Sequence, residues 1–196
     1  MRRIKEVSLR SSAILFFSFL LIFGLSSSTS AAPSARVQPV APGSSNYEAW
    51  LTKEVRHQLV MLPFYSVFDN LQYKIEGSKV TLIGQVVRPV LKDDAGYAVK
   101  HIEGVESVDN QIEVLPVSPN DNRLRLAVYR SIYSFPSLQL YQVRSVPPIH
   151  IIVDNGHLTL EGSVATKADK DVAGIRANTV PGIFSVTNNL RVDNGK

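Results

Sequence analysis

The chain has 196 residues, no cysteine and a formal net charge of +4. Without cysteine it can form neither a disulfide nor a thiolate metal site. The excess positive charge lies in residues 1–31, because the remainder has 17 basic and 16 acidic side chains, a net charge of +1. This dispersed and nearly balanced charge argues against a nucleic-acid partner.

The N-terminal segment has the pattern of a secretory signal. Basic residues precede an apolar run of thirteen residues, 13–25, and small residues follow over 26–32. About 20 apolar residues are needed to span a bilayer, so we predict a signal peptide over 1–31, cleaved after Ala31, and a periplasmic protein. The alternative is an uncleaved signal anchor. Residues 32–46 contain three prolines and are predicted to be a disordered linker.

The first folded unit is predicted to begin with a helix that ends at Pro63. Its apolar stripe has a 3.6-residue period and comprises Leu51, Val55, Leu59 and Leu62. Two strands, 71–75 and 80–83, then form an antiparallel hairpin. A second helix begins near Pro89, ends at Gly104 and leads to a third strand.

The same pattern returns seventy-eight positions later. Residues 80–84 (V-T-L-I-G) match residues 158–162 (L-T-L-E-G), and each run is predicted to be a strand that ends on its glycine. Alignment of 71–115 on 149–193 without gaps gives 13 identities in 45 positions. A register of that length indicates duplication of one folding unit.

We therefore predict two tandem units, at 47–116 and 121–193, in an α+β protein. In the second unit, residues 154–156 (D-N-G) indicate a tight hairpin. A helix connects the second strand to the third in each unit, so those two strands should be parallel. Each unit is then an α-β-β-α-β fold, a three-stranded mixed sheet covered by two helices.

Two runs of the second unit resemble the BON domain (bacterial OsmY and nodulation): I-H-I-I-V-D-N-G-H-L-T-L-E-G-S-V and V-P-G-I-F-S-V-T-N-N-L-R-V. The first unit has weaker counterparts, I-E-G-S-K-V-T-L-I-G-Q-V and I-E-G-V-E-S-V-D-N-Q-I-E-V. The resemblance implies an OsmY-like protein with two α-β-β-α-β units and a signal peptide. It also implies binding to phospholipid, roles in envelope or osmotic stress or as a chaperone, and no enzyme activity.

No arrangement of reactive side chains indicates catalysis. The four histidines have no metal-ligand spacing: His57, His101, His150 and His157. The glycines lie outside any phosphate-binding motif, and no serine lies in a nucleophile elbow. We predict no catalytic residue, no metal site and no cofactor.

The first helix of the second unit carries the candidate binding surface. Its core stripe is predicted to be Leu124, Val128, Ile132 and Phe135. The opposite face is predicted to bind lipid or a partner through Arg123, Leu126, Tyr129, Arg130 and Tyr133. Arg125 is expected on its flank. Alternatively, the two tyrosines pack against the first unit or against the loop inserted before residue 149.

Net charge differs between the units, −3 over residues 48–116 and +3 over 117–196. We therefore predict a non-enzymatic envelope protein whose second unit binds anionic phospholipid membrane surfaces. The alternative is a periplasmic protein-interaction or holdase module that binds envelope proteins, because proteins use exposed tyrosine and arginine for that purpose too.

Overall fold

The computed structural model describes residues 45–144 and 146–193. The predicted signal peptide, 1–31, lies outside these residues, as does all but the end of the predicted linker. The first helix begins at Ser45, within that predicted linker. No helix in the described part of the chain is both long and apolar enough to cross a membrane.

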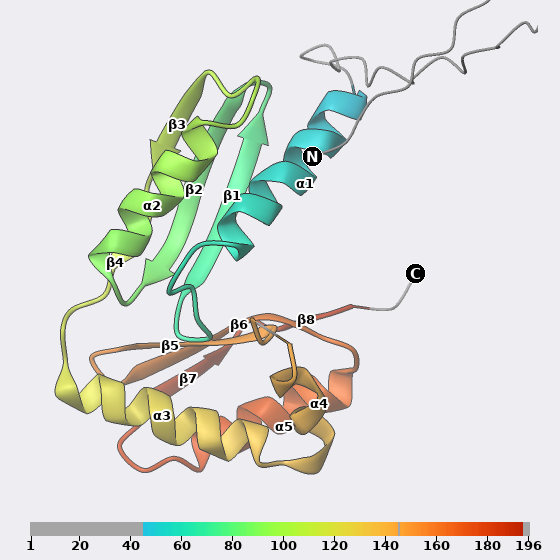
Figure 1. Ribbon diagram of the computed structural model, residues 1–196. Coiled ribbons are helices and arrows are strands. Elements are labelled where there is room, and N and C mark those ends of the chain that lie inside the picture. Colours follow the sequence, from blue (N-terminus) through green and yellow to red (C-terminus); the bar gives the residue numbers. More distant parts are fainter. Residues whose placement is uncertain (1–44, 145, 194–196) are drawn as a thin grey trace, which may run out of the picture. The chain divides into compact units, whose positions relative to one another are not determined.

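The first repeat has the predicted order of elements, α-β-β-α-β (Figure 1). Its elements are α1 (Ser45–Val60), β1 (Asn70–Glu76), β2 (Lys79–Val86), α2 (Pro89–Lys100), β3 (Ser107–Asn110) and β4 (Glu113–Val114). β1 runs antiparallel to β2, whereas β3 and β4 both run parallel to β2. The mixed sheet is confirmed, with its third strand broken into two short pieces.

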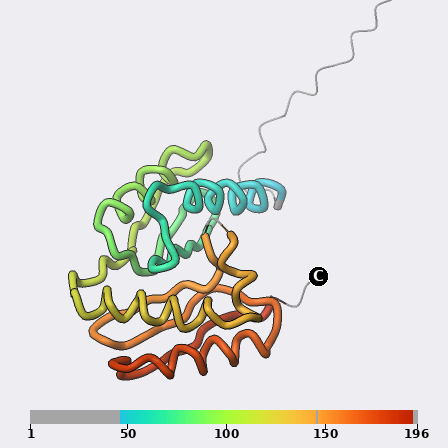
Figure 2. The backbone as a smooth tube through the Cα atoms, turned by 60° about the horizontal axis from the view of Figure 1, so that its bottom comes forward, coloured from blue at the N-terminus to red at the C-terminus, as the bar shows by residue number. Residues whose placement is uncertain are grey.

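The second repeat has the same topology, with one short insertion after its first helix. Its elements are α3 (Pro119–Tyr133), the 3-10 turn η1 (Pro136–Leu138), α4 (Gln139–Gln142), β5 (Ile149–Asp154), β6 (His157–Val164), α5 (Lys167–Asn178), β7 (Ser185–Asn188) and β8 (Arg191–Val192). Leu71 pairs with Gly84, and Ile149 pairs with Gly162, so the strand register shifts by the same seventy-eight positions as the sequence. Helices α3 and α5 pack side by side (Figure 2).

The paired glycines lie inside their strands, and the prediction that each strand ends there is wrong. Gly84 has φ +120° and Gly162 has φ +110°, and each strand continues two residues further. A Cβ on Gly84 would lie 2.0 Å from the carbonyl oxygen of Asn70, and one on Gly162 would lie 2.0 Å from that of Pro148. Only glycine allows the hairpin backbones to approach so closely.

An asparagine at the end of β3, and its counterpart at the end of β7, account for two of the identities between the repeats. Asn110 Nδ2 donates to the carbonyl oxygen of Lys92 in α2 at 2.8 Å, and its counterpart Asn188 donates to that of Lys170 at the same distance. A Cβ at Gly96 would lie 2.8 Å from the Asn110 amide nitrogen, and one at Gly174 of α5 would lie 2.9 Å from that of Asn188. A side chain at either glycine would therefore displace the asparagine amide from its helix carbonyl.

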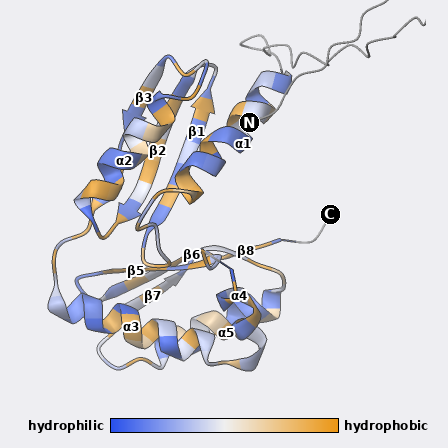
Figure 3. Ribbon diagram, in the orientation of Figure 1, coloured by the Kyte–Doolittle hydropathy of each residue, from blue (hydrophilic) through white to orange (hydrophobic). Residues whose placement is uncertain are grey.

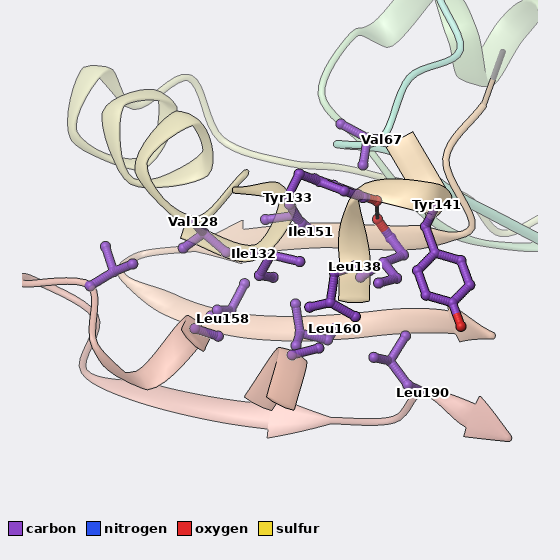
Figure 4. Close-up of a cluster of buried hydrophobic side chains, with 14 of the residues drawn as sticks. Val67, Val128, Ile132, Tyr133, Leu138, Tyr141, Ile151, Leu158, Leu160 and Leu190 are labelled. Carbon is purple, nitrogen blue, oxygen red and sulfur yellow. Dashed lines mark hydrogen bonds between the residues drawn. The ribbon is translucent and has the colours of Figure 1, made fainter. Parts of the chain in front are cut away.

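Each repeat has its own hydrophobic core between helices and sheet. Bands of hydrophobic and hydrophilic residues alternate along α1, α2 and α3 (Figure 3), as expected of helices that bury one face. The first core includes Leu51, Val55, Leu82 and Leu91, all fully buried. The second core is shown in Figure 4 and includes Val128, Ile132, Leu158 and Leu160.

One predicted core residue, Phe135, is 37% exposed. Helix α3 ends at Tyr133, and Pro136 starts the 3-10 turn, so the helical stripe does not extend to Phe135. Leu138, fully buried, joins the core in its place.

A loop residue of the first repeat, Val67, belongs to the second core (Figure 4). Its carbonyl oxygen accepts a hydrogen bond from the Ile151 amide of β5 at 2.8 Å. Two neighbouring aromatic residues also contact the second repeat, since Tyr65 stacks on His150 and Phe68 meets Tyr129 edge-on.

Candidate membrane-binding surface on helix α3

Helix α3 is held at its N-terminus by two carboxylate hydrogen bonds. Ser118 caps the helix through its Oγ, which accepts from the Asp121 amide at 3.1 Å, and Pro119 occupies the first turn. The buried Asp121 carboxylate accepts hydrogen bonds from the amides of Asn155 at 3.0 Å and Gly156 at 2.9 Å. The start of α3 is therefore fixed to the turn between β5 and β6.

Three of the predicted site residues form an exposed row on this helix. Arg123, Leu126 and Arg130 are spaced i, i+3 and i+7, which places them on one face. Leu126 is 46% exposed, and both arginines are exposed. We call these three residues the α3 stripe.

Tyr133 does not lie on this surface, and its predicted exposure is wrong. It is only 3% exposed, and its hydroxyl donates to the carbonyl oxygen of Ile149 at 3.0 Å. This burial raises the pKa of the Tyr133 hydroxyl. The residue is covered because η1 and α4 fold back onto α3, so the helix packs against this segment as well as against the sheet and α5.

Tyr129 is half-buried and also packs inside the protein. Its ring lies 4.8 Å from the Tyr133 ring and 6.1 Å from Phe68 of the first repeat. Gln142 of α4 donates to its hydroxyl at 2.8 Å. The alternative in which these tyrosines pack against the first unit and the inserted segment is therefore confirmed, and Tyr129 contributes only an edge to the surface.

Arg125, expected on the flank of this face, is buried. Its guanidinium donates to Asn122 Oδ1 and to the carbonyl oxygen of Val153, both at 2.6 Å. Desolvation lowers its pKa, and the charge of Asp121 partly opposes that change. Arg125 therefore fastens α3 to the end of β5 and is not available to a ligand.

Phe135 is the exposed aromatic residue that the sequence analysis missed at this end of the helix. The guanidinium of Arg176 lies 5.9 Å from the centre of its ring. The proline that follows Phe135 was the available signal, because a helix rarely continues into proline.

The histidines do not gather into a metal site. In the described residues, no group of three or more His, Cys, Asp or Glu side chains is placed to hold a metal ion. His57, His101 and His157 are exposed, whereas the Nδ1 atom of His150 is buried.

Two small α-β-β-α-β units, with a charged and apolar surface on one helix, define a tandem binding-domain protein. The family model described as "BON domain" matches residues 47–116 and 138–194, and the chain belongs to this family. Helix α3 precedes the second match, although it packs on the same sheet. BON domains are non-catalytic binding domains associated with membrane or protein interaction, typically in the cell envelope. Membership supports a non-enzymatic envelope protein with a tandem arrangement.

Among solved structures, this chain is similar to the C-terminal domain of CdsD, titled the structural protein of the type III secretion system of Chlamydia trachomatis. That match has 16% identity, a TM-score of 0.26, and covers 72% of this chain and 96% of that one. A second CdsD structure matches with 17% identity, the same TM-score, and coverages of 71% and 90%. TM-scores this low support no argument about function. The comparison with curated proteins finds no match.

Proposed function

We propose that the protein binds anionic phospholipid membrane surfaces through its second repeat, in the periplasm and during envelope or osmotic stress. The observation that carries this proposal is the α3 stripe, in which Leu126 lies between Arg123 and Arg130 on one exposed face. The stripe belongs to the half of the chain with a net charge of +3.

The chemistry of the stripe fits a lipid headgroup. Guanidinium groups bind phosphate through paired hydrogen bonds, and each basic residue near an anionic membrane contributes about 1 kcal/mol. Arg123 and Arg130 would together contribute about 2 kcal/mol, and burying the exposed half of Leu126 would add about 1 kcal/mol. Binding of this strength is reversible and requires a high fraction of anionic lipid.

Co-sedimentation with vesicles tests the proposal. Arg130→Glu should weaken binding to phosphatidylglycerol-rich vesicles by about tenfold to thirtyfold, because the change removes one attraction and adds a repulsion of similar size. Arg56→Glu, at an exposed position of α1 in the first repeat, is the matched control and should have little effect. Binding should also fall as salt rises, since the Debye length is about 8 Å at physiological ionic strength.

Equal binding to zwitterionic and anionic vesicles, or unchanged binding by Arg130→Glu, would contradict the proposal.

A protein-interaction or holdase role is the second candidate. It is favoured by apolar side chains exposed elsewhere on the second repeat, with Phe184 75% and Ile175 63% exposed. Such side chains suit an apolar polypeptide segment. Suppressed aggregation of an unfolded client, lost in Phe184→Ser but not in Arg130→Glu, would favour this role.

A further inference from the structure

A groove between α1 and α2 of the first repeat has a volume of about 470 Å³. Three of its lining residues are aromatic, Trp50, Tyr97 and His101, and two are acidic, Glu54 and Glu103. The volume lies within the range of about 300–1,000 Å³ typical of ligand sites. Aromatic faces beside carboxylates suit an organic cation.

The side chains of the groove are arranged in two rows. Trp50 and Glu54 are four residues apart on α1, whereas Tyr97 lies on α2 and His101, four residues further, caps the C-terminus of that helix. The Tyr97 and His101 rings are 4.1 Å apart, and His101 Nδ1 donates to the Tyr97 carbonyl oxygen at 2.7 Å. Gln58 Nε2 donates to the Glu54 carboxylate at 2.8 Å. These contacts orient the aromatic and acidic groups before any ligand arrives.

In the second repeat, a guanidinium group lies between the two helices that correspond to α1 and α2. The seventy-eight-position shift places Arg176 where the first repeat has Ala98. Arg176 Nε donates to the carbonyl oxygen of Ser131 in α3 at 2.9 Å, and its guanidinium lies 5.9 Å from the Phe135 ring. The second repeat thus supplies its own guanidinium between α3 and α5. In the first repeat, the small Ala98 side chain lines the groove instead.

We propose that the groove of the first repeat binds the guanidinium group of an arginine side chain on a partner polypeptide. The arginine would lie between α1 and α2, stacked against Tyr97 near Trp50 and hydrogen-bonded to Glu54. The net charge of −3 over residues 48–116 favours a basic partner. This site goes beyond the proposed lipid function, because it lies on the other repeat and takes a ligand of opposite charge.

Trp50 is the chain's only tryptophan, so its fluorescence reports on this groove. The blocked peptide acetyl-Gly-Arg-Gly-amide should change the Trp50 emission saturably, with millimolar affinity. The citrulline peptide has nearly the same shape without the charge and should bind at least about fivefold more weakly. Tyr97→Ser should weaken arginine binding about threefold, and Tyr97 is 68% exposed, so the fold should be retained.

Ala98→Arg is the decisive variant, because it gives the first repeat the arginine that the second already holds. Its side chain should fill the groove and abolish the peptide response, with an unchanged circular dichroism spectrum. Arg176→Ala in the second repeat is the control and should leave the response intact. If Ala98→Arg does not fold, the double variant Glu54→Gln with Tyr97→Ser tests the proposal instead. Its affinity for the arginine peptide should be about tenfold lower than that of the parent.

Two results would overturn the proposal: equal binding of the arginine and citrulline peptides, or full binding by a folded Ala98→Arg variant. If methylguanidinium changed the Trp50 emission as strongly as the peptide does, the partner would not be a polypeptide, and the groove would bind a small organic cation instead. Vesicle binding is measured separately and should be unchanged in Tyr97→Ser, so failure of this site is distinguishable from failure of the lipid proposal.

Discussion

The substitution Tyr133→Ser separates a packing residue from a membrane contact. The structure places this side chain in the second core, with 3% of its surface exposed and its hydroxyl bonded to the carbonyl oxygen of Ile149. Removal of a buried aromatic ring typically costs about 3–5 kcal/mol. The variant also leaves that carbonyl oxygen without this donor. We therefore expect Tyr133→Ser to lower the free energy of unfolding by about 4 kcal/mol.

Urea denaturation followed by far-ultraviolet circular dichroism measures this loss. Tyr133→Phe keeps the ring and removes only the hydrogen bond, so it should cost about 1–2 kcal/mol. Leu126→Ser, on the exposed stripe of the same helix, should cost less than Tyr133→Ser because Leu126 is 46% exposed. At temperatures where each variant is folded, Leu126→Ser should bind anionic vesicles more weakly, whereas Tyr133→Phe should bind like the parent.

The reasoning would be refuted if the free energy of unfolding of Tyr133→Ser lay within about 0.5 kcal/mol of the parent value and the variant nevertheless lost vesicle binding. That result would mean that the tyrosine faces the membrane and that η1 and α4 do not cover it.

Three further predictions concern backbone strain and titration. Gly162→Ala should destabilise the protein by about 3 kcal/mol in the same urea assay, because the new Cβ would lie 2.0 Å from the carbonyl oxygen of Pro148. Gly77→Ala is its control: nothing lies within 4 Å of its Cβ position, so only the positive φ should cost about 1–2 kcal/mol. Burial lowers the pKa of His150, so the free energy of unfolding should fall as pH drops below about 6.5, and His150→Phe should reduce that fall. Burial raises the pKa of Tyr65 to about 12, so the stability that this group contributes should be fully present below pH 10 and fall by about 1.4 kcal/mol per pH unit between 10 and 12. Tyr65→Phe should remove this part of the alkaline fall, whereas other buried tyrosines such as Tyr133 still contribute to it.

The repeated frame was predictable because its residues obey local backbone constraints. Gly84 and Gly162 match in sequence because, at each, a backbone carbonyl oxygen of the facing chain lies where a Cβ would be. Asn110 and Asn188 match because each side chain donates a hydrogen bond to a carbonyl oxygen of the neighbouring helix. The seventy-eight-position shift therefore carries over to strand pairing without a change of register. The role of the glycines was not predictable, because glycine is used both at strand ends and where strands need positive φ.

The outer face of α3 was predicted only in part. A helical period identifies a single buried stripe, so it does not reveal a residue that is buried on another side of the helix. Besides the sheet and α5, α3 packs against the segment from Pro136 to Gln142. The path of that segment depends on contacts distant in sequence, such as the Tyr141 hydroxyl with Asp169 at 3.0 Å. Arg125 was misplaced for a similar reason, since its partner Val153 lies twenty-eight residues away.

The two repeats also differ at helix positions that the shared glycines and asparagines do not use. Arg176 replaces Ala98 on the second helix, and the net charge changes from −3 to +3 between the two halves. Because the glycines and asparagines that hold each sheet to its helix are separate from these positions, one surface can change without loss of the fold. A phosphate-binding stripe on one repeat and an arginine-binding groove on the other would let the protein hold a basic polypeptide at an anionic membrane. The two sites share no residue, so Tyr97→Ser and Arg130→Glu should act independently, each affecting only its own ligand. Coupling between them, measured as arginine-peptide affinity in the presence and absence of vesicles, would instead show that the repeats respond to each other.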